Sequence, residues 1–501
     1  FALADTPIGG LTLPTAQGPS LSVVDHPADP NSKLLLVTGR NAEELRSAAS
    51  ALALNARAFS GPTALVSEFQ PPPARKPYDA PRWLPTDRPV QFGELGQAGD
   101  FSVAGYSPDV VRVNFQLPPD LFTWRTAGLP LDLQYRYTPR PRPDQSTLNV
   151  NVNDTFVGSL PLRAAYPGGD HWWNPIATRL MADGTTVETR EVTLPSLALS
   201  ARNQLRLHYY FEPVVGKCMP LLANAGGSID PRSTLDLSGL PHYIAMPELA
   251  TFANSGFPFT RLADLAETAV ILPDQPTTAD VETYLDLLGV IGRATGYPAL
   301  RLKVGRAGDA AQWADRDLLV LGNKQRQPLL TQWEQHMPVQ QPGANTTQWR
   351  LAGWVDDAVK LVVGTRARGD LPTVAPPMTV ADDGRRAMIA GFESPLREGR
   401  SVVAVITPEG SHASLIEALL TPDLLSDIQG SLAIVRDKQV NSVLGSQVYY
   451  VGQLPPLTWL RWQMSRSPLV LFAITLGIAL LGAAAAYASL RLRARRRLQN
   501  A

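Results

Sequence analysis

The stretch PLVLFAITLGIALLGAAAAYASL, residues 468–490, contains no charged residue in 23 positions, and five arginines follow it within residues 491–497. As a helix rising ~1.5 Å per residue it would extend roughly 35 Å, enough to cross a bilayer core of ~30 Å with some tilt. A buried core helix of this length would rarely lack a charge throughout. The sequence therefore predicts a transmembrane helix over residues 467–490.

The basic tail after this stretch sets its expected orientation. Positively charged flanks of a membrane helix stay in the cytoplasm, so we expect a cytoplasmic C-terminus and a body on the other side of the membrane. The chain begins at Phe1 with no hydrophobic signal stretch, so we expect an incomplete or processed N-terminus. The residues that predict this topology are Arg491, Arg493, Arg495, Arg496 and Arg497.

A second helix is expected just before the span, within residues 451–466. Pro456 can begin a helix, and the apolar and aromatic side chains after it recur at helical spacing. An amphipathic helix that carries tryptophan is suited to the membrane interface. The predicted membrane-interface residues are Trp459, Leu460, Trp462 and Met464.

Composition restricts what the rest of the chain can do. The 501 residues exceed what one core can hold, so several domains are expected. The 45 basic and 45 acidic residues balance, and without the five tail arginines 40 basic residues face 45 acidic ones, a net charge of −5. A mildly acidic body has no electrostatic footprint for nucleic acid. Cys218 is the single cysteine, which excludes an intrachain disulfide.

Residues 1–96 read as α/β sequence followed by a linker. An apolar strand is expected at residues 33–37 and a helix with one apolar face at residues 42–54. A proline-rich connector covers residues 70–90. One strand and one helix make a thin domain, so we predict a partial α/β domain here.

Residues 97–237 change to alternating apolar and polar residues. The alternation is clearest at residues 131–137, 148–152 and 205–211. Several such segments, broken by Gly, Pro and Asn, are typical of an antiparallel sandwich of jelly-roll type.

Residues 238–450 return to strands alternating with helices, which favours a parallel or mixed sheet covered by helices. The expected strands are residues 268–272, 299–304, 317–321, 359–363 and 401–406, and the expected helices are residues 277–294 and 411–420.

A search for chemical motifs finds little. The six histidines are not at metal-ligand spacing, and the sequence lacks the glycine-rich phosphate and dinucleotide motifs and the serine-nucleophile motif. The sequence therefore predicts no metal site and no cofactor.

One local cluster, at residues 168–174, suggests carbohydrate binding. Paired tryptophans beside short polar side chains could stack on sugar rings and bind their hydroxyl groups. The alternative, which we favour, is that they cover the rim of the sandwich core, and Trp124 is likewise interpreted as a core residue. The candidate carbohydrate-contact residues are Trp172, Trp173, Asp170 and Asn174.

Two other functions stay open. A membrane-tethered glycan hydrolase would need two carboxylates roughly 5–9.5 Å apart. Asp154, Asp170 and Glu212 lie in the predicted sandwich, but nothing marks them as a pair, and we expect no catalysis. A structural scaffold would have no glycan contact at all.

Several long strings resemble the bacterial cellulose synthase regulatory subunit, the B subunit that accompanies the membrane-embedded synthase. They include LPPDLFTWR at residues 117–125, HYIAMP at residues 242–247 and FANSGFPF at residues 252–259. Further strings lie at residues 59–64, 69–83, 130–139 and 262–268.

The resemblance implies alternating jelly-roll, carbohydrate-binding-like domains and flavodoxin-like domains, with one C-terminal helix packed against the catalytic subunit. The family usually has two domains of each kind, so a first jelly roll is expected to be missing here. The fold class expected is α+β multidomain, a jelly-roll sandwich flanked by flavodoxin-like domains, with one transmembrane helix. The expected divisions are residues 1–96, 97–237, 238–450, 451–466, 467–490 and 491–501.

The resemblance also implies a non-catalytic subunit of the bacterial inner membrane with its body in the periplasm. The expected partners are the catalytic subunit, the nascent β-1,4-glucan and membrane lipid, while self-association is left open. The family is often described as binding cyclic di-GMP. This sequence has no arginine-rich nucleotide motif, and we expect that messenger to act on the catalytic partner.

Overall fold

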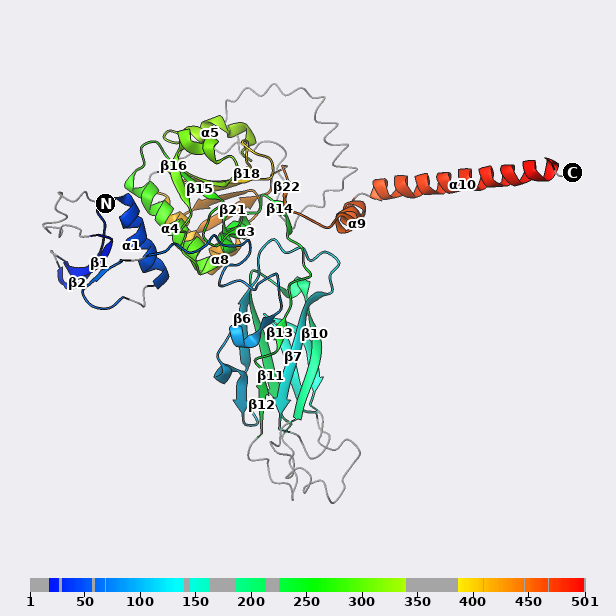
Figure 1. Cartoon of the computed structure of the whole chain (residues 1–501), viewed down its shortest axis with the longest axis horizontal. Coiled ribbons are helices and arrows are strands. Elements are labelled where there is room, and N and C mark those ends of the chain that lie inside the picture. Colours follow the sequence, from blue (N-terminus) through cyan, green and yellow to red (C-terminus); the bar gives the residue numbers. More distant parts are fainter. Residues whose placement is uncertain are drawn as a thin grey trace, which may run out of the picture.

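The computed structural model comprises a small N-terminal unit, a β-sandwich, an α/β body and a helical C-terminal extension. In Figure 1 the sandwich lies below the α/β body, the N-terminal unit lies beside α4, and α10 projects away from all of them. The residues it describes are 18–26, 29–55, 59–67, 69–138, 145–162, 186–212, 225–338, 386–408, 410–445, 447–466 and 468–499.

The N-terminal unit is a three-stranded antiparallel sheet in the order β2-β1-β3, with α1 packed against it. The strand and helix expected here are confirmed. The Asn41 side chain caps α1 by accepting hydrogen bonds from the backbone N–H groups of Glu43 and Glu44. The elements are β1 Ser20–His26, β2 Asp29–Thr38, α1 Ala42–Asn55 and β3 Thr63–Leu65.

Two antiparallel sheets form the sandwich. The first contains β4 Val90–Gln91, β5 Ser102–Ala104, β7 Gly128–Tyr137, β10 Thr186–Pro195, β12 Gly226–Ile229 and β13 Thr234–Leu235. The second has the order β6-β11-β8-β9, formed by β6 Val111–Gln116, β8 Thr147–Val152, β9 Thr155–Pro161 and β11 Arg202–Tyr210. Short 3₁₀ helices are η2 Phe92–Glu94, η3 Ala98–Phe101 and η4 Ser196–Ala198.

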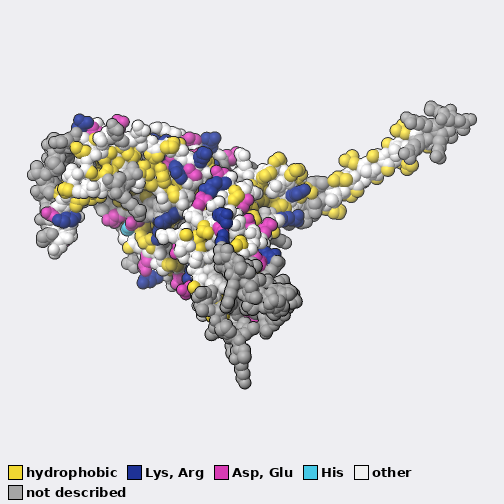
Figure 2. All heavy atoms as spheres, turned by 60° about the horizontal axis from the view of Figure 1, so that its bottom comes forward, with side chains coloured by type: hydrophobic (Ala, Val, Ile, Leu, Met, Phe, Trp, Pro, Cys, Tyr) yellow, Lys and Arg dark blue, Asp and Glu magenta, His cyan; other side chains and the backbone are white. Residues whose placement is uncertain are grey.

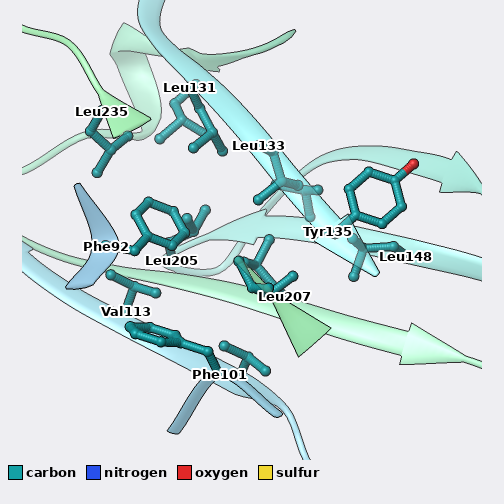
Figure 3. Close-up of a cluster of buried hydrophobic side chains, with 14 of the residues drawn as sticks. Phe92, Phe101, Val113, Leu131, Leu133, Tyr135, Leu148, Leu205, Leu207 and Leu235 are labelled. Carbon is teal, nitrogen blue, oxygen red and sulfur yellow. The ribbon is translucent and has the colours of Figure 1, made fainter. Parts of the chain in front are cut away.

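The core between these sheets follows from the alternation in the sequence. Leu131, Leu133 and Tyr135 of β7 are buried in one cluster with Leu205 and Leu207 of β11 (Figure 3). Because side chains of a strand point alternately to its two sides, every second residue reaches this core. The alternation predicted at residues 131–137, 148–152 and 205–211 is therefore confirmed.

The α/β body has a seven-stranded sheet in the order β16-β15-β17-β19-β18-β20-β21. The first four strands in this order are parallel and the others antiparallel, so the sheet is mixed. Its strands are β15 Thr268–Leu272, β16 Lys303–Arg306, β17 Asp317–Gly322, β18 Ala387–Glu393, β19 Ser401–Ile406, β20 Leu432–Arg436 and β21 Gln439–Val443.

The expected elements of this body are largely confirmed. The strand expected at residues 299–304 begins only at Lys303, and the one expected at residues 359–363 lies outside the described residues. The helices are α3 Leu249–Ser255, α4 Thr278–Thr295, α5 Pro328–Gln332, α7 His412–Leu420 and α8 Pro422–Ser426, with 3₁₀ helices η5 Phe259–Arg261, η6 Ala307–Trp313 and η7 Glu334–His336.

The C-terminal extension begins with a strand that the sequence did not predict. The helix expected within residues 451–466 begins at Pro456, the residue expected to start it, as α9 Pro456–Arg466. The residues before it form β22 Tyr449–Gly452, which pairs with β14 Tyr243–Met246. Aromatic and β-branched residues can form a strand once a partner edge is present, and β14 supplies that edge.

The last helix is α10 Pro468–Gln499, which continues past the predicted span into the arginine-rich tail. Its segment Thr475–Leu492 has a mean hydropathy of 1.5 and no buried part, so α10 is a candidate membrane span. Figure 2 shows hydrophobic side chains gathered on α9 and along α10.

A glycine in the sandwich provides a test of this packing. At Gly227 in β12, an added Cβ would lie 2.6 Å from the ring of Tyr209, which is buried and donates to the backbone carbonyls of Arg136 and Ser228. Because that ring cannot move freely, Gly227→Ala should lower the free energy of unfolding by about 1–3 kcal/mol.

Urea unfolding of the full chain in detergent measures this change. Gly158→Ala in β9 is the matched control, because its Cβ would meet no atom within 4 Å. Equal unfolding midpoints for the two variants would contradict the packing described here.

Candidate functional site

The junction between the sandwich and the α/β body is built around the carboxyl group of Asp120. This side chain has no exposed surface. It accepts a 2.5 Å hydrogen bond from the Tyr78 hydroxyl, and its other oxygen lies 2.8 Å from His242 Nδ1. The rings of Tyr78 and His242 stack with centroids 3.5 Å apart. Three segments far apart in sequence thus meet at one buried group.

Backbone contacts around Asp120 hold these segments in place. Its carbonyl accepts a hydrogen bond from the N–H of Tyr243, and the N–H of Phe122 donates to the carbonyl of Pro241. Tyr78 has a φ of 62°, a left-handed conformation that costs energy for a bulky residue. Burial, together with the nearby Asp120 carboxylate, raises the pKa of the Tyr78 phenol, which keeps it a hydrogen-bond donor.

An aromatic socket lies next to this junction, and we define it as Phe122, Tyr243 and Tyr450. Tyr243 and Tyr450 stack with centroids 5.2 Å apart. The Trp462 ring of α9 meets all three edge-on, with centroids 6.0 Å from Phe122, 5.4 Å from Tyr243 and 5.3 Å from Tyr450. The sandwich, β14 and β22 therefore each supply one ring of the socket.

Other side chains of α9 stay open. Leu457 is 70% exposed, and Trp459 and Leu460 are each 46% exposed. Leu457 and Leu460 share the side turned away from Trp462, whereas Trp459 is exposed near the edge of the Trp462 side. The structure thus separates the four predicted interface residues: Leu460 lies on the open side, Trp459 is exposed beside the socket side, Trp462 enters the socket, and Met464 is half-buried. Because α10 follows directly, the open apolar side of α9 leads into the candidate span.

The other predicted site residues are placed differently. Arg491 is exposed on α10, and the backbone of residues 493–497 continues the same helix. The predicted carbohydrate-contact residues Trp172, Trp173, Asp170 and Asn174 lie outside the described residues.

The carboxylates considered for a hydrolase do not form a pair among the described residues. The Asp154 side chain is 95% exposed and lies 3.3 Å from Arg206 at one end of β8. Glu212 lies at the other end, where its N–H donates to Ser146 Oγ. The length of β8 separates them by roughly 20 Å, beyond the spacing of glycosidase carboxylates. Asp170 is not described, and within the described ranges no group of three His, Cys, Asp or Glu could hold a metal ion.

The residues of the junction were not identified as a site from the sequence, although a signal was present. Tyr78, Asp120 and His242 all lie within the strings that resemble the regulatory-subunit family. Tyr78 and Asp120 are 42 residues apart and Asp120 and His242 are 122 residues apart, so no local pattern reveals their contact.

Comparison with family models matches three successive regions of the chain. Residues 1–66 match "Cellulose synthase BcsB, first FD domain", residues 89–234 match "Cellulose synthase BcsB, second CBM domain", and residues 242–405 match "Cellulose synthase BcsB, second FD domain". Of the junction residues, Tyr78 lies between the first two regions, Asp120 inside the second and His242 at the start of the third.

Curated relatives agree with these matches. The chain is 44% identical over its full length to a "Cyclic di-GMP-binding protein" of Xanthomonas axonopodis pv. citri, of which it covers 63%. It is 40% identical over 98% of its length to a protein of the same name from Pseudomonas fluorescens, of which it covers 65%. It is 34% identical to "Cellulose synthase 2" of Novacetimonas hansenii, covering 98% of this chain and 30% of that protein. The chain thus spans a little under two thirds of the first two relatives.

The Asp120 junction predicts a large effect of a single substitution. Asp120→Ala removes both acceptor oxygens, so the Tyr78 hydroxyl and His242 Nδ1 lose their shared partner. Leaving a buried donor unpaired should lower the free energy of unfolding by about 2–4 kcal/mol. Denaturant unfolding of the full chain in detergent measures it. Asp154→Asn, at an exposed position, should change stability by less than about 0.5 kcal/mol, and similar losses in both variants would refute the role of Asp120.

The socket predicts how firmly α9 is held. Trp462→Ala removes three aromatic contacts, each worth roughly 0.5–1.5 kcal/mol beyond its buried area, so amide hydrogen exchange in residues 456–466 should accelerate at least about tenfold. Trp459→Ala, at an exposed position of α9, should leave exchange unchanged. Hydrogen-exchange mass spectrometry on the full chain in detergent distinguishes them, and equal protection in the two variants would show that α9 is not held by the socket.

Proposed function

The chain belongs to the BcsB family of cellulose synthase subunits, and from that premise we propose that it is a non-catalytic, membrane-anchored subunit that supports the catalytic subunit through α9 and α10. The observation that carries the proposal is the two-sided packing of α9. One side is fixed to the body through Trp462, and the other leaves Leu457 and Leu460 open beside a membrane-length helix.

A helix arranged in this way can serve as a docking element. Its open side is apolar, so it would lie in the lipid interface and against the transmembrane helices of the catalytic subunit. The socket fixes the angle at which α9 leaves the body, and a fixed angle would position α10 beside its partner. Within lipid the hydrophobic effect does not drive helices together, so they associate through close packing of their side chains. The surface of α10 itself would therefore contribute to the contact.

We infer the orientation from the basic tail. Arg491, Arg493 and Arg495–Arg497 would stay in the cytoplasm, which places the folded body in the periplasm of a bacterial inner-membrane protein. Cyclic di-GMP, named for several relatives, would then act on the catalytic partner, because the body and a cytoplasmic messenger would lie on opposite sides of the membrane.

The finer architecture is also part of the proposal. The parallel strands follow the spatial order β16-β15-β17-β19, which in chain order is 2-1-3-4 and supports a flavodoxin-like domain over residues 238–450. The two antiparallel sheets support a jelly-roll domain over residues 97–237. The partial α/β domain and linker would cover residues 1–96.

Within this assembly the sandwich would guide the β-1,4-glucan chain as it leaves the membrane. The matched region at residues 89–234 supports a carbohydrate-binding role over a purely structural scaffold. The distance between Asp154 and Glu212 argues against the hydrolase alternative.

Coexpression with the catalytic subunit tests the docking role. Replacing residues 471–489 of α10 with a leucine helix of equal length keeps the anchor but removes its specific surface. We expect cellulose output to fall at least about tenfold, because van der Waals complementarity drives helix association in membranes. A second variant, Leu457→Ser with Leu460→Ser, tests the open side of α9 and should also lower output.

Arg461→Gln, on the same helix, is the control and should keep full output. If both the leucine-helix and the serine variants give wild-type cellulose output, the docking role is contradicted and α10 acts only as a tether. Membrane fractionation shows that each variant is inserted.

A further inference from the structure

The second sheet of the sandwich turns every other side chain outward in register. In β8, Asn149 and Asn151 face out between buried neighbours. Asn149 lies beside His208 of β11, and Gln204 of β11 lies beside Asn114 of β6. Such rows repeat roughly every 6.6–6.8 Å along strands that lie about 4.8 Å apart. The outward side chains therefore form a regular grid.

This grid is rich in neutral hydrogen-bonding groups, and we name it the amide face. Two amide contacts are made within it: Gln204 Nε2 donates to Asn114 Oδ1 at 3.0 Å, and Thr147 Oγ1 donates to Asn149 Oδ1 at 3.3 Å. The Oδ1 atom of Asn151 is buried and has no hydrogen-bond partner. The amide face consists of Asn114, Asn149, Asn151, Gln204, His208 and Tyr210.

Aromatic rings and three arginines complete this surface, with Arg112 directly across from Arg206 and Arg202 across from Gln116. Tyr210, at one end of β11, is 45% exposed, and Phe156, beside Asn151 on β9, is 63% exposed. Arg206 crosses the centre, where its Nε donates to Gln204 Oε1 at 2.7 Å and its guanidinium lies 3.3 Å from Asp154. Large rings exposed on a sheet surface offer flat apolar area to a ligand.

The outer side of the opposite sheet has a different chemistry. Asp132 and Glu191 lie across from each other there, both exposed. Asp230 lies 2.9 Å from Arg232 and 3.7 Å from Arg136, and the hydrogen bond from Arg232 lowers the pKa of Asp230 to about 2. Both outward surfaces therefore carry charges, and the second sheet is distinguished by its row of amides beside exposed aromatic rings.

We propose that the amide face binds a β-1,4-glucan chain. A glucan has hydroxyl groups on its ring edges, which pair with amides because an amide both donates and accepts, and apolar C–H faces, which pack on aromatic rings. The whole face lies within residues 89–234, the region that matches the CBM model.

This inference rests on the proposed function, which supplies the polymer, and it moves the glucan contact from the predicted Trp172–Trp173 loop to a sheet surface. The sandwich would then hold the chain along its side.

The test uses the full chain in detergent, with cellohexaose as the probe and titration calorimetry as the measurement. Tyr210→Ala, Asn149→Ala and His208→Ala should each weaken binding about fivefold to tenfold, because each removes a ring or a hydrogen-bonding group. Tyr210→Phe keeps the ring and should bind better than Tyr210→Ala. Thr189→Ala, exposed on the opposite sheet, is the matched control and should bind as the wild type does.

Absence of binding by the folded wild-type chain would overturn the inference, and so would unchanged binding in all three alanine variants. Loss confined to a Trp172→Ala, Trp173→Ala variant would assign the contact to the loop instead. Thermal unfolding of each variant checks its fold, and Asn149→Ser and His208→Gln replace any alanine variant that unfolds.

Cellulose output on coexpression separates this inference from the proposed function. If cellulose output depends on the chain but is unchanged by the amide-face substitutions, only the glucan-binding inference is contradicted. If the catalytic subunit gives full cellulose output without the chain, the proposed function is contradicted.

Discussion

The buried carboxyl group of Asp120 is the contact on which the arrangement of the molecule depends. It has no exposed surface and joins a tyrosine of the linker to a histidine at the start of the α/β body. A buried polar group of this kind is favourable only while its partners stay in place, because each unpaired donor or acceptor costs roughly 1–3 kcal/mol. Asp120 therefore penalises any rotation of the sandwich against the α/β body.

The position of the C-terminal helices follows from that junction. The socket residues Phe122 and Tyr243 lie next to Asp120 and His242 in sequence, so the same backbone contacts that enclose the carboxyl group set the distance between two of the socket rings. Tyr450 enters from β22, which pairs with β14. Trp462 then transfers the orientation of the body to α9. Helices connected in this way are oriented by the folded body, and a flexible connection in place of the socket would lose that orientation.

In the sandwich, a single hydrophobic core supports two outward surfaces of different composition. Its inward residues pack as a continuous cluster, while the two outward surfaces differ, since one carries carboxylates beside arginines and the other carries amides, exposed rings and arginines. Alternation decides only that a side chain faces out, and leaves its chemistry free to vary. Stability and ligand choice can therefore change separately in this domain.

Much of the fold could be predicted from the sequence because its signals are local. The uncharged stretch at residues 468–490, the period-two alternation of β7, β8 and β11, and the strands and helices of the α/β body all arise from neighbours a few positions apart. The start of α9 at Pro456 was predicted, whereas the strand at residues 449–452 was not, because it forms only when β14 lies beside it. The candidate site was harder to predict than the fold. The helical period of α9 groups Trp459 with Trp462, and it does not indicate which side another segment will cover.

By itself, then, the amino-acid sequence determined the element types, the membrane-length helix and the family resemblance, because hydrophobic periodicity and charge act over short stretches of chain. Only the tertiary structure decided that Tyr78, Asp120 and His242 share one buried contact, that Trp462 turns inward while Trp459 stays open, and that the outward amides of three strands form one surface. The physical reason is that these features depend on strand register and on the path of the linker. These bring Tyr78 to Asp120 across 42 positions of the chain, and Asp120 to His242 across 122 positions.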